Sequence, residues 1–330
     1  MAFPFSNSRR RASYGRSRFG QSGRGRSSYG RRGGGIPVRL LIGLAVIAFS
    51  LLSYYFKTDT NPITGEEQRV ALADEADEVA IGFQAAPGMI EQHGGRLTGQ
   101  AAMVVEDVGN ELVRSMELAY LDGQANPYRF EFFLLQDPQT VNAFALPGGP
   151  VFITQALYNR LETRGRLAGV LGHEIGHVVA RHGNQRMAQQ KRDQGISSGV
   201  AVASGSYNTA RMAQMAIQTA SMKHGRDQEL ESDEWGVRLM PLAGYDPADL
   251  IEVMNVLEAA SGGASGPEFA STHPSPANRR EQITASIEKL PPGALDKVNP
   301  RKTNDPLPPI QSRGSYRSQA PRTLQDLLGR

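Results

Sequence analysis

The chain has 330 residues and no cysteine, which excludes a disulfide framework, a Cys-ligated metal site and a thiol nucleophile. Its formal net charge of +3 averages two unlike parts. Residues 1–57 hold eleven basic residues and no acidic one, which leaves 25 basic against 33 acidic residues, a net charge of −8, for the remainder. A body with that charge repels phosphate, so a nucleic-acid-binding body is not expected.

Residues 1–35 are predicted to be a disordered cytoplasmic tail. They consist mainly of Arg, Gly and Ser, and such a composition buries too little apolar surface to offset the entropy of ordering. The Arg-Gly steps leave open a membrane-tethered RNA-binding protein as an alternative function. Anionic lipid is the more ordinary partner for a cluster of cations beside a membrane.

Residues 36–56 are predicted to form a transmembrane signal anchor. The 17 residues from Leu40 to Phe56 carry no charge, and a span of about 20 residues matches the hydrocarbon thickness. A cleaved signal peptide is the alternative, but the long basic lead and the lack of a small-x-small cleavage site argue against it. The positive-inside rule places the tail in the cytoplasm and the body in the periplasm. We therefore expect a single-pass protein of the bacterial inner membrane, with lipid contacting residues 36–56 and the basic tail.

Residues 57–290 are predicted to form one α+β domain that is mainly helical. Apolar residues recur with helical spacing in two early segments, and strands are indicated before and after Pro147-Gly148-Gly149-Pro150. The expected helices cover 66–84, 101–120, 155–162, 165–190, 208–240 and 247–260, and the expected strands cover 128–135, 141–146 and 151–154. Residues 291–330 are Pro-rich and polar, and we expect a largely disordered tail there.

The strongest chemical signal is His173-Glu174-Ile175-Gly176-His177. Residues i and i+4 share one face of a helix, so the two imidazoles converge on one point, as a Zn²⁺ site requires. Glu174 stands next to the first histidine and can serve as the general base, which is the H-E-x-x-H metalloprotease arrangement. The apolar surroundings predict a buried helix. A pair of ordinary core histidines is the alternative, but these groups would be costly to bury without partners.

The third ligand is predicted on a second helix. An H-x-x-G-x-x-H extension is absent, because Gly183 stands six residues after His177 and His182, five residues on, is expected at a helix end on another face. In the segment KHGRDQELESDEWGVRLM, Glu229 and Asp233 lie at i and i+4. We predict that Glu229 is the third ligand and that Asp233 accepts a ligand imidazole N–H. A solvated acidic helix face is the alternative for this segment.

These residues resemble the HtpX-like and type 1 CAAX-prenyl-protease family of zinc metallopeptidases, which are gluzincins. The resemblance covers roughly residues 61–290, and the opening NPITGEEQRV looks like periplasmic members of the LoiP and BepA type. This chain departs from them in having a membrane anchor and no lipobox Cys. The resemblance implies a zincin-like domain with a small sheet beside the active-site helix. Four ordered segments carry it: NAFALPGGPVFITQAL (142–157), HEIGHVVARH (173–182), RDQELESDEWG (226–236) and STHPSPANR (271–279).

The resemblance also implies further site residues. Asn142, Ala143 and Phe144 would lie on a strand of the cleft, to which a substrate adds as an extra strand; an ordinary buried hairpin is the alternative. His273 matches a histidine that approaches the open side of the metal, where it would stabilise the oxyanion as a catalytic residue or cover the metal at rest. Arg279 matches a basic residue with a structural role.

The sequence thus predicts a membrane-anchored zinc metalloendopeptidase with one Zn²⁺ per chain. His173, His177 and Glu229 would hold the metal, and Glu174 would accept the proton of the attacking water and pass it to the leaving amine. The expected substrates are unfolded or misassembled envelope proteins, which makes the function protein quality control. A non-proteolytic chaperone or assembly factor that keeps zinc for structure is the alternative, although it would not need Glu174.

Overall fold

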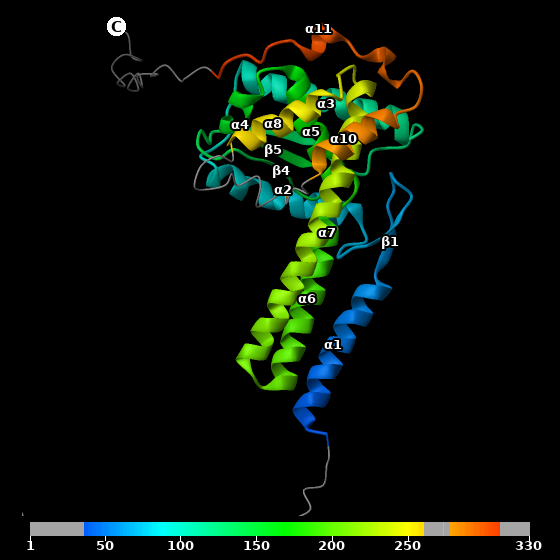
Figure 1. The fold of residues 1–330 in the computed structure, drawn as a ribbon, viewed down its shortest axis with the longest axis vertical. Helices are drawn as coiled ribbons and strands as arrows, with labels where there is room; N and C mark the ends of the chain where they lie inside the picture. Colours follow the sequence, from blue (N-terminus) through cyan, green and yellow to red (C-terminus); the bar gives the residue numbers. More distant parts are fainter. Residues whose placement is uncertain (1–35, 261–272, 274–277, 311–330) are drawn as a thin grey trace, which may run out of the picture. The chain divides into compact units, whose positions relative to one another are not determined.

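The computed structural model describes residues 36–260, 273 and 278–310, and the chain divides into two units, residues 1–37 and 38–330. The predicted basic tail, residues 1–35, lies outside the described residues. The second unit contains, in chain order (Figure 1), α1 (Val38–Phe56), β1 (Thr58–Thr60), β2 (Glu67–Arg69), α2 (Glu75–Gln92), α3 (Gln100–Tyr120), β3 (Glu131–Leu135), β4 (Ala143–Ala145), β5 (Pro150–Thr154), α4 (Gln155–Leu161), α5 (Arg164–Val179), α6 (His182–Ser204), α7 (Tyr207–Leu242), α8 (Asp249–Ala260), α10 (Arg279–Glu288), η1 (Ala294–Lys297) and α11 (Pro300–Thr303).

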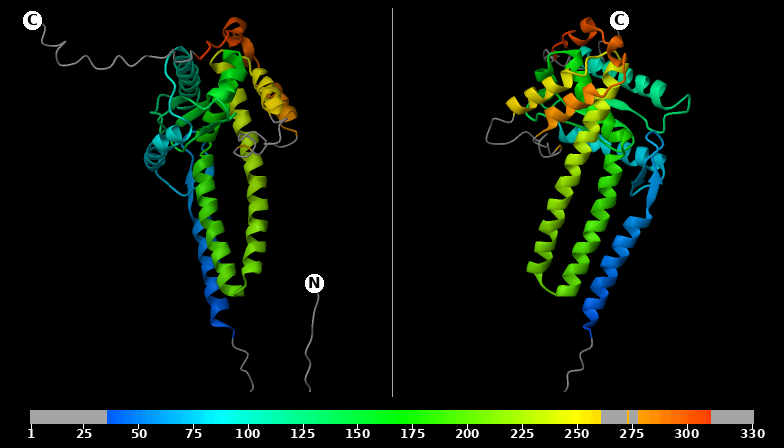
Figure 2. Two further views of the ribbon diagram at one scale, coloured as in Figure 1. Left: turned by 90° about the vertical axis from the view of Figure 1, so that its left-hand side faces the viewer. Right: turned by 45° about the vertical axis from the view of Figure 1, so that its right-hand side comes forward.

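Helix α1 has the length and composition to cross a membrane, and no other helix in the described part of the chain does. Its large side chains are exposed; Phe49 and Phe56, for example, are 74% and 82% accessible. One face of α1 is covered by α6, which runs beside it in Figures 1 and 2. The predicted apolar segment 36–56 is therefore helical from Val38, and most of its surface has no protein neighbour among the described residues.

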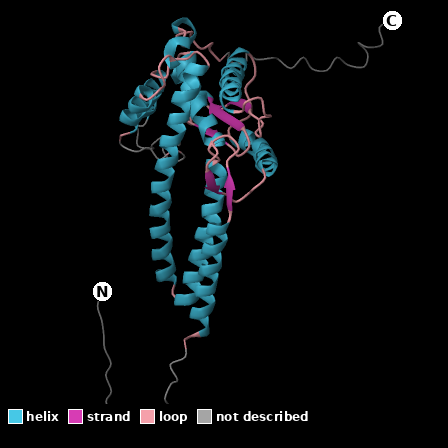
Figure 3. Ribbon diagram, turned by 90° about the vertical axis from the view of Figure 1, so that its right-hand side faces the viewer, coloured by secondary structure: helices cyan, strands magenta, loops and turns pink. Residues whose placement is uncertain are grey.

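A three-stranded sheet lies against α5 (Figure 1), and strands are drawn in magenta in Figure 3. Its order is β3-β5-β4, with β3 parallel and β4 antiparallel to β5, so β4 occupies an edge. The connection from β4 to β5 contains Gly148 and Gly149, whose φ angles of 77° and 130° favour glycine. A Cβ at either position would overlap neighbouring backbone. The two strands predicted around this Pro-Gly-Gly-Pro turn are therefore present as a hairpin.

Helix α5 lies at the centre of the hydrophobic core. Fourteen of its 16 residues are buried, because α3, α7, α8 and the sheet pack around it. Glycines permit this close approach: Gly172 faces Gly236 of α7, and Gly176 faces Ser232 and Trp235 of the same helix. The packing brings the acidic segment of α7 directly against the helix that carries the H-E-x-x-H motif.

The helix predicted over residues 165–190 is in fact two helices. α5 ends at Val179 and α6 begins at His182, because Arg181 takes a left-handed conformation with φ of 58°. Hydrophobic periodicity does not reveal this break, since apolar and small residues continue through it.

The helix predicted over residues 66–84 is also divided. Residues 67–69 form β2, which pairs antiparallel with β1, and α2 begins only at Glu75. The carboxylate of Asp74 caps α2 by accepting the backbone N–H of Ala76. The start of this helix is therefore set by its cap, nine residues later than the apolar spacing suggested.

Residues 291–310 are ordered, against the expectation of a largely disordered C-terminal tail. They contain η1 and α11, and Thr163 forms an isolated bridge with Pro306. The hydroxyl of Tyr158 in α4 donates to the carbonyl oxygen of Pro308 at 3.0 Å. These contacts hold the proline-rich segment on the domain; residues 311–330 lie outside the described part.

Candidate active site and metal centre

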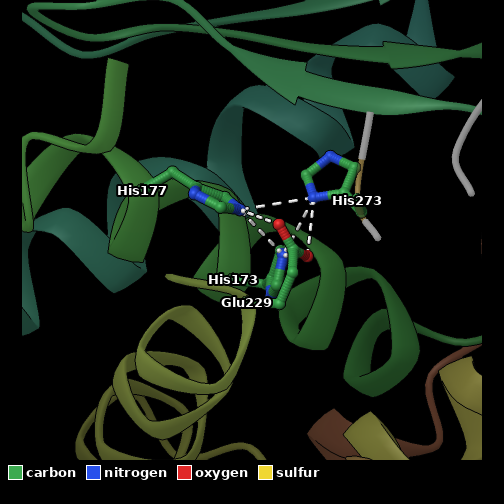
Figure 4. Close-up of side chains that lie close together, drawn as sticks. All are labelled: His173, His177, Glu229 and His273. Carbon is green, nitrogen blue, oxygen red and sulfur yellow. Dashed lines mark hydrogen bonds and ion pairs between the residues drawn. The ribbon is translucent and has the colours of Figure 1, made fainter. Parts of the chain in front are cut away.

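Helix α5 presents His173, Glu174 and His177 to the same region. Thr163 caps the helix by accepting the N–H of Arg166. The Nε2 atoms of His173 and His177 lie 3.1 Å apart (Figure 4), as the i, i+4 spacing predicts. All three side chains are buried, so the burial expected from the apolar surroundings is present.

Helix α7 adds Glu229 to this pair. Its Oε2 lies 3.3 Å from His173 Nε2, and its Oε1 lies 3.4 Å from His177 Nε2. His273 completes a cluster of four buried residues whose ligand atoms all lie within 4.8 Å of one another. Its Nδ1 is 2.9 Å from Glu229 Oε2 and 3.3 Å from each of the other two imidazoles (Figure 4).

The donor set fits a tetrahedral metal ion. Ligands at about 2.0–2.1 Å from Zn²⁺ stand roughly 3.3 Å apart from one another in a tetrahedron, and the three imidazole nitrogens of this cluster are 3.1–3.3 Å apart. Glu229 Oε1 and both oxygens of Glu174 are buried with no hydrogen-bond partner among the described residues. Burial alone would raise the pKa of Glu229, but the neighbouring His273 and His173 hold it well below its usual range. A buried anion among imidazoles is what a cation site requires.

Asp233 and Arg279 orient the first imidazole. Asp233 Oδ1 lies 2.8 Å from His173 Nδ1, so the assigned tautomer donates Nδ1–H and leaves Nε2 free for a metal. Arg279 donates from Nε to Asp233 Oδ2 at 2.6 Å and from Nη2 to Oδ1 at 2.8 Å. Burial opposes protonation of His173, but the contacts with the carboxylates of Asp233 and Glu229 together outweigh it and raise the pKa of the imidazole.

His182 orients the second imidazole, against the expectation that it faces elsewhere. It is the first residue of α6, and the left-handed Arg181 turns it back, so that its Nδ1 lies 2.8 Å from His177 Nδ1. Its Nε2 lies 3.0 Å from Glu231 Oε2. When His182 donates Nε2–H to Glu231, its Nδ1 accepts Nδ1–H from His177, and the Nε2 of His177 is left for a metal.

Residues 101–287, which make up more than half of the chain, match the model of peptidase family M48. The chain belongs to peptidase family M48. The resemblance to HtpX-like gluzincins and the mainly helical α+β fold predicted from the sequence are thereby confirmed. Membership of M48 implies a metal, and the cluster at His173, His177, Glu229 and His273 is the donor set that the described residues offer.

Several curated relatives bear names of proteases, and some of those names specify a metalloendopeptidase. The beta-barrel assembly-enhancing protease of Escherichia coli K12 is 29% identical over 197 residues, which cover 56% of this chain and 40% of that protein. The mitochondrial metalloendopeptidase OMA1 is 32% identical over 189 residues in Schizosaccharomyces pombe, covering 56% of this chain and 53% of the relative. OMA1 of Saccharomyces cerevisiae is 24% identical over 249 residues, 72% of this chain and 71% of the relative. The chain thus spans about half or less of the length of the Escherichia coli and Schizosaccharomyces pombe relatives.

The cluster of His173, His177, Glu229 and His273 opens into a cleft of about 450 Å³. Glu174 and His177 line the cleft together with Asn142, Phe144 and His93. Burial raises the pKa of Glu174, and the nearby His273 opposes that rise. The general-base candidate thus faces the space in which a peptide would lie.

The predicted substrate strand borders this cleft. Asn142 immediately precedes β4, and its carbonyl accepts the N–H of Thr154 from β5 at 3.0 Å. Because successive residues of a strand point their backbone groups to opposite sides, the carbonyl of Ala143 faces the open edge. There His273 Nε2 lies 3.2 Å from the Ala143 oxygen. Phe144 stacks on Phe152 of β5 at 4.9 Å between ring centroids.

Three residues at or beside the site had little or no signal in the sequence: His182, Glu231 and His93. His182 and its partner Glu231 come together only because the chain turns at Arg181. His93 follows α2 and bonds through Nδ1 to Asp137 Oδ2 at 3.0 Å, facing the cleft from a loop with no motif. His224, which lies close in sequence to Glu229, is half-buried and is not among the residues that line this cleft.

Proposed function

We propose that the chain is a membrane-anchored zinc metalloendopeptidase that hydrolyses peptide bonds of unfolded or misassembled envelope proteins. The observation that carries the proposal is the convergence of His173, His177 and Glu229 from two helices, with the carboxylate of Glu174 beside them, whose buried oxygens accept no hydrogen bond among the described residues. One ion per chain follows from the single cluster found among the described residues. The names of the M48 relatives support peptide hydrolysis.

The side chains can be given roles in the reaction. A bound Zn²⁺ would act as a Lewis acid on the scissile carbonyl and lower the pKa of water towards about 7. Glu174 accepts the proton of the attacking water on one carboxylate oxygen and later donates it to the leaving amine. Asp233 and His182 hold the two imidazoles in the tautomers that direct Nε2 towards the metal.

His273 is assigned to cover the site at rest. Its Nδ1 occupies the fourth corner of the cluster, and its Nε2 engages the Ala143 carbonyl on the open edge of β4. A substrate that adds to this edge needs the Ala143 carbonyl, and an attacking water needs the fourth corner. One movement of His273 therefore releases both positions. This assignment is favoured over a role in stabilising the oxyanion, because Nε2 points to the strand.

The anchor and the location follow from α1 and the sequence before it. The 19 residues of α1 are long enough to span a bilayer, and nine Arg precede it while the acidic residues follow it. We propose that the N-terminus is cytoplasmic and that the catalytic domain is periplasmic. The envelope as the place of the substrates is supported by the name of the beta-barrel assembly-enhancing protease.

The decisive experiment is metal analysis and casein cleavage by the full chain in detergent micelles, for wild type and Glu174→Gln. Both proteins should hold one zinc per chain, and the variant should lose about 100-fold or more of the cleavage rate. Glu234→Gln is the matched control, because Glu234 lies on α7 but is half-exposed and pairs with Arg238. A Glu174→Gln protein that cleaves casein at the wild-type rate would refute the proposed mechanism and favour the assembly-factor alternative.

A further inference from the structure

Helices α6 and α7 form a long hairpin that accompanies α1. The α6–α7 hairpin comprises residues 191–223, over which the chain leaves the domain along α6 and returns along α7. Figures 1 and 2 show α1, α6 and α7 side by side, and α1 packs on α6 more extensively than any other pair of elements.

The contact between α1 and α6 is made through small residues. Gly195, Gly199 and Ala203 recur every four residues on one face of α6. A Cβ on Gly199 would overlap the side chain of Ile47, and a Cβ on Gly43 would overlap the backbone of Gly199. Such small-xxx-small packing with backbones in close approach is typical of helices that associate inside a membrane.

The hairpin matches the length of the apolar part of α1. At one end the guanidinium of Arg192 lies 4.6 Å from the ring centroid of Tyr54. At the other end Arg39 lies beside Gly205, the C-cap residue of α6, with its Nη1 2.9 Å from the position a Cβ would take. The hairpin therefore reaches from one end of the uncharged stretch of α1 to the other.

Charged residues are nearly absent from the same length of the hairpin. Between Asp193 and Lys223 the one charged residue is Arg211, close to the tip, where a long side chain can reach the interface. Ser221 donates to Asp193 at 3.2 Å, which places the charged end of α6 level with the returning helix. Large apolar side chains face outward in between: Val202, Tyr207, Met212 and Met215 are 42%, 81%, 72% and 60% exposed.

We propose that the α6–α7 hairpin lies in the lipid bilayer beside α1, so that three helices enter the membrane. The inference rests on the proposed anchoring by α1. The hairpin has too many Gln, Ser and Thr to cross a membrane unaided, and it does not qualify as a span by composition. Its packing on α1 supplies the partner that makes insertion favourable. Because α6 begins five residues after His177 and α7 carries Glu229, both helices that flank the metal site continue into the bilayer.

The absence of native cysteine permits a direct test, because each introduced thiol reports alone. A membrane-impermeant maleimide is added to spheroplasts and, separately, to inverted membrane vesicles that contain the full chain. Leu118→Cys in α3 reports the body side, since Leu118 is 87% exposed, and Ser27→Cys reports the tail side. The sites under test are Phe49→Cys in α1, Val202→Cys in α6 and Met215→Cys in α7, with Ala201→Cys and Met212→Cys as a second hairpin pair.

The inference predicts that Phe49→Cys and the hairpin thiols stay unlabelled in both preparations and react after detergent is added. Casein cleavage at the wild-type rate shows that each variant is folded. Labelling of the hairpin thiols in either preparation, with Phe49→Cys still protected, overturns the inference and leaves the anchor intact. Labelling of Phe49→Cys in spheroplasts instead overturns the anchor, and the inference falls with it.

Discussion

The Nε of Arg181 donates a 2.7 Å hydrogen bond to the carboxylate of Glu78 on α2, and each of the two residues is only 1% exposed. Arg181 also donates from Nη1 to Asp59 of β1 at 2.7 Å and from Nη2 to the carbonyl of Leu72. The residue that joins the metal-site helix α5 to α6 is therefore bound to α2 and to the strand that follows α1.

Replacing Arg181 with Ala should destabilise the protein by about 3–5 kcal/mol, because it leaves a buried carboxylate without its counter-charge. Burial already raises the pKa of Glu78, and Arg181 is the main group that opposes this rise. The measurement is thermal unfolding of the full chain in detergent micelles. Arg238→Ala is the control: its pair with Glu234 is half-exposed, so about 0–1 kcal/mol is expected. Equal shifts for the two variants would contradict a special role of the buried pair.

Replacing His273 with Ala should increase the cleavage of casein. In the covered state the His273 imidazole occupies the fourth corner of the cluster and contacts the Ala143 carbonyl. Only the uncovered fraction of the molecules can cleave casein, so covering lowers the cleavage rate. Removing the imidazole should raise the rate about threefold or more, with the zinc content unchanged. A loss of about 100-fold in the rate would show instead that His273 stabilises the oxyanion. The rate and the zinc content are measured on the same preparation.

Replacing His182 with Ala should lower the affinity for zinc by about 10- to 100-fold, because His177 loses the acceptor that fixes its tautomer. His182→Asn should restore part of the affinity, since an amide oxygen can accept the same N–H. Competition with a chelator measures the affinity directly, and a merely structural role would not move it. His224→Ala serves as the control, since His224 lies outside the cleft lining. A zinc affinity of His182→Ala equal to that of wild type would contradict the positioning role.

The candidate site residues could be predicted from the sequence because each pair is local. His173 and His177 share a helix face at i, i+4, and Glu229 and Asp233 do the same on α7, so helical geometry alone predicts which side chains point together. The apolar run of α1 and the turn between β4 and β5 were likewise readable from local composition. Where one helix or one turn determines the geometry, a single sequence was sufficient.

The contacts that were not predicted join distant segments of the chain. Arg279 meets Asp233 from 46 positions away, and its hydrogen bonds have no local pattern. His182 reaches His177 only because one residue, Arg181, adopts a left-handed φ that its side chain does not favour. That conformation is held by Glu78 and Asp59, more than 100 residues earlier. Periodicity extends a helix through such a point because it carries no information about tertiary partners.

Asp249, the first residue of α8, provides a test of stability against pH. Burial raises its pKa from 3.8 to about 6, neighbouring Asp246 adds to the rise, and Arg166 opposes it. Its Oδ2 is buried with no hydrogen-bond partner among the described residues. The folded state therefore binds this proton more tightly than the unfolded state, so the contribution of Asp249 to stability is fully present below about pH 4 and is lost as the pH rises through about 6. At pH 8 the buried charge should cost roughly 1–2 kcal/mol after allowing for partial solvent screening.

Replacing Asp249 with Asn removes this cost and should stabilise the full chain at pH 8, with the gain vanishing at pH 4, where the wild-type carboxyl is protonated. The quantity to compare is the difference in unfolding midpoint between variant and wild type at each pH, because zinc release at low pH affects both proteins alike. Glu258→Gln, at an exposed position near the other end of α8, is the control and should show little pH-dependent difference. A gain of equal size at pH 4 and pH 8 would mean that packing, and not the buried charge, distinguishes the two side chains.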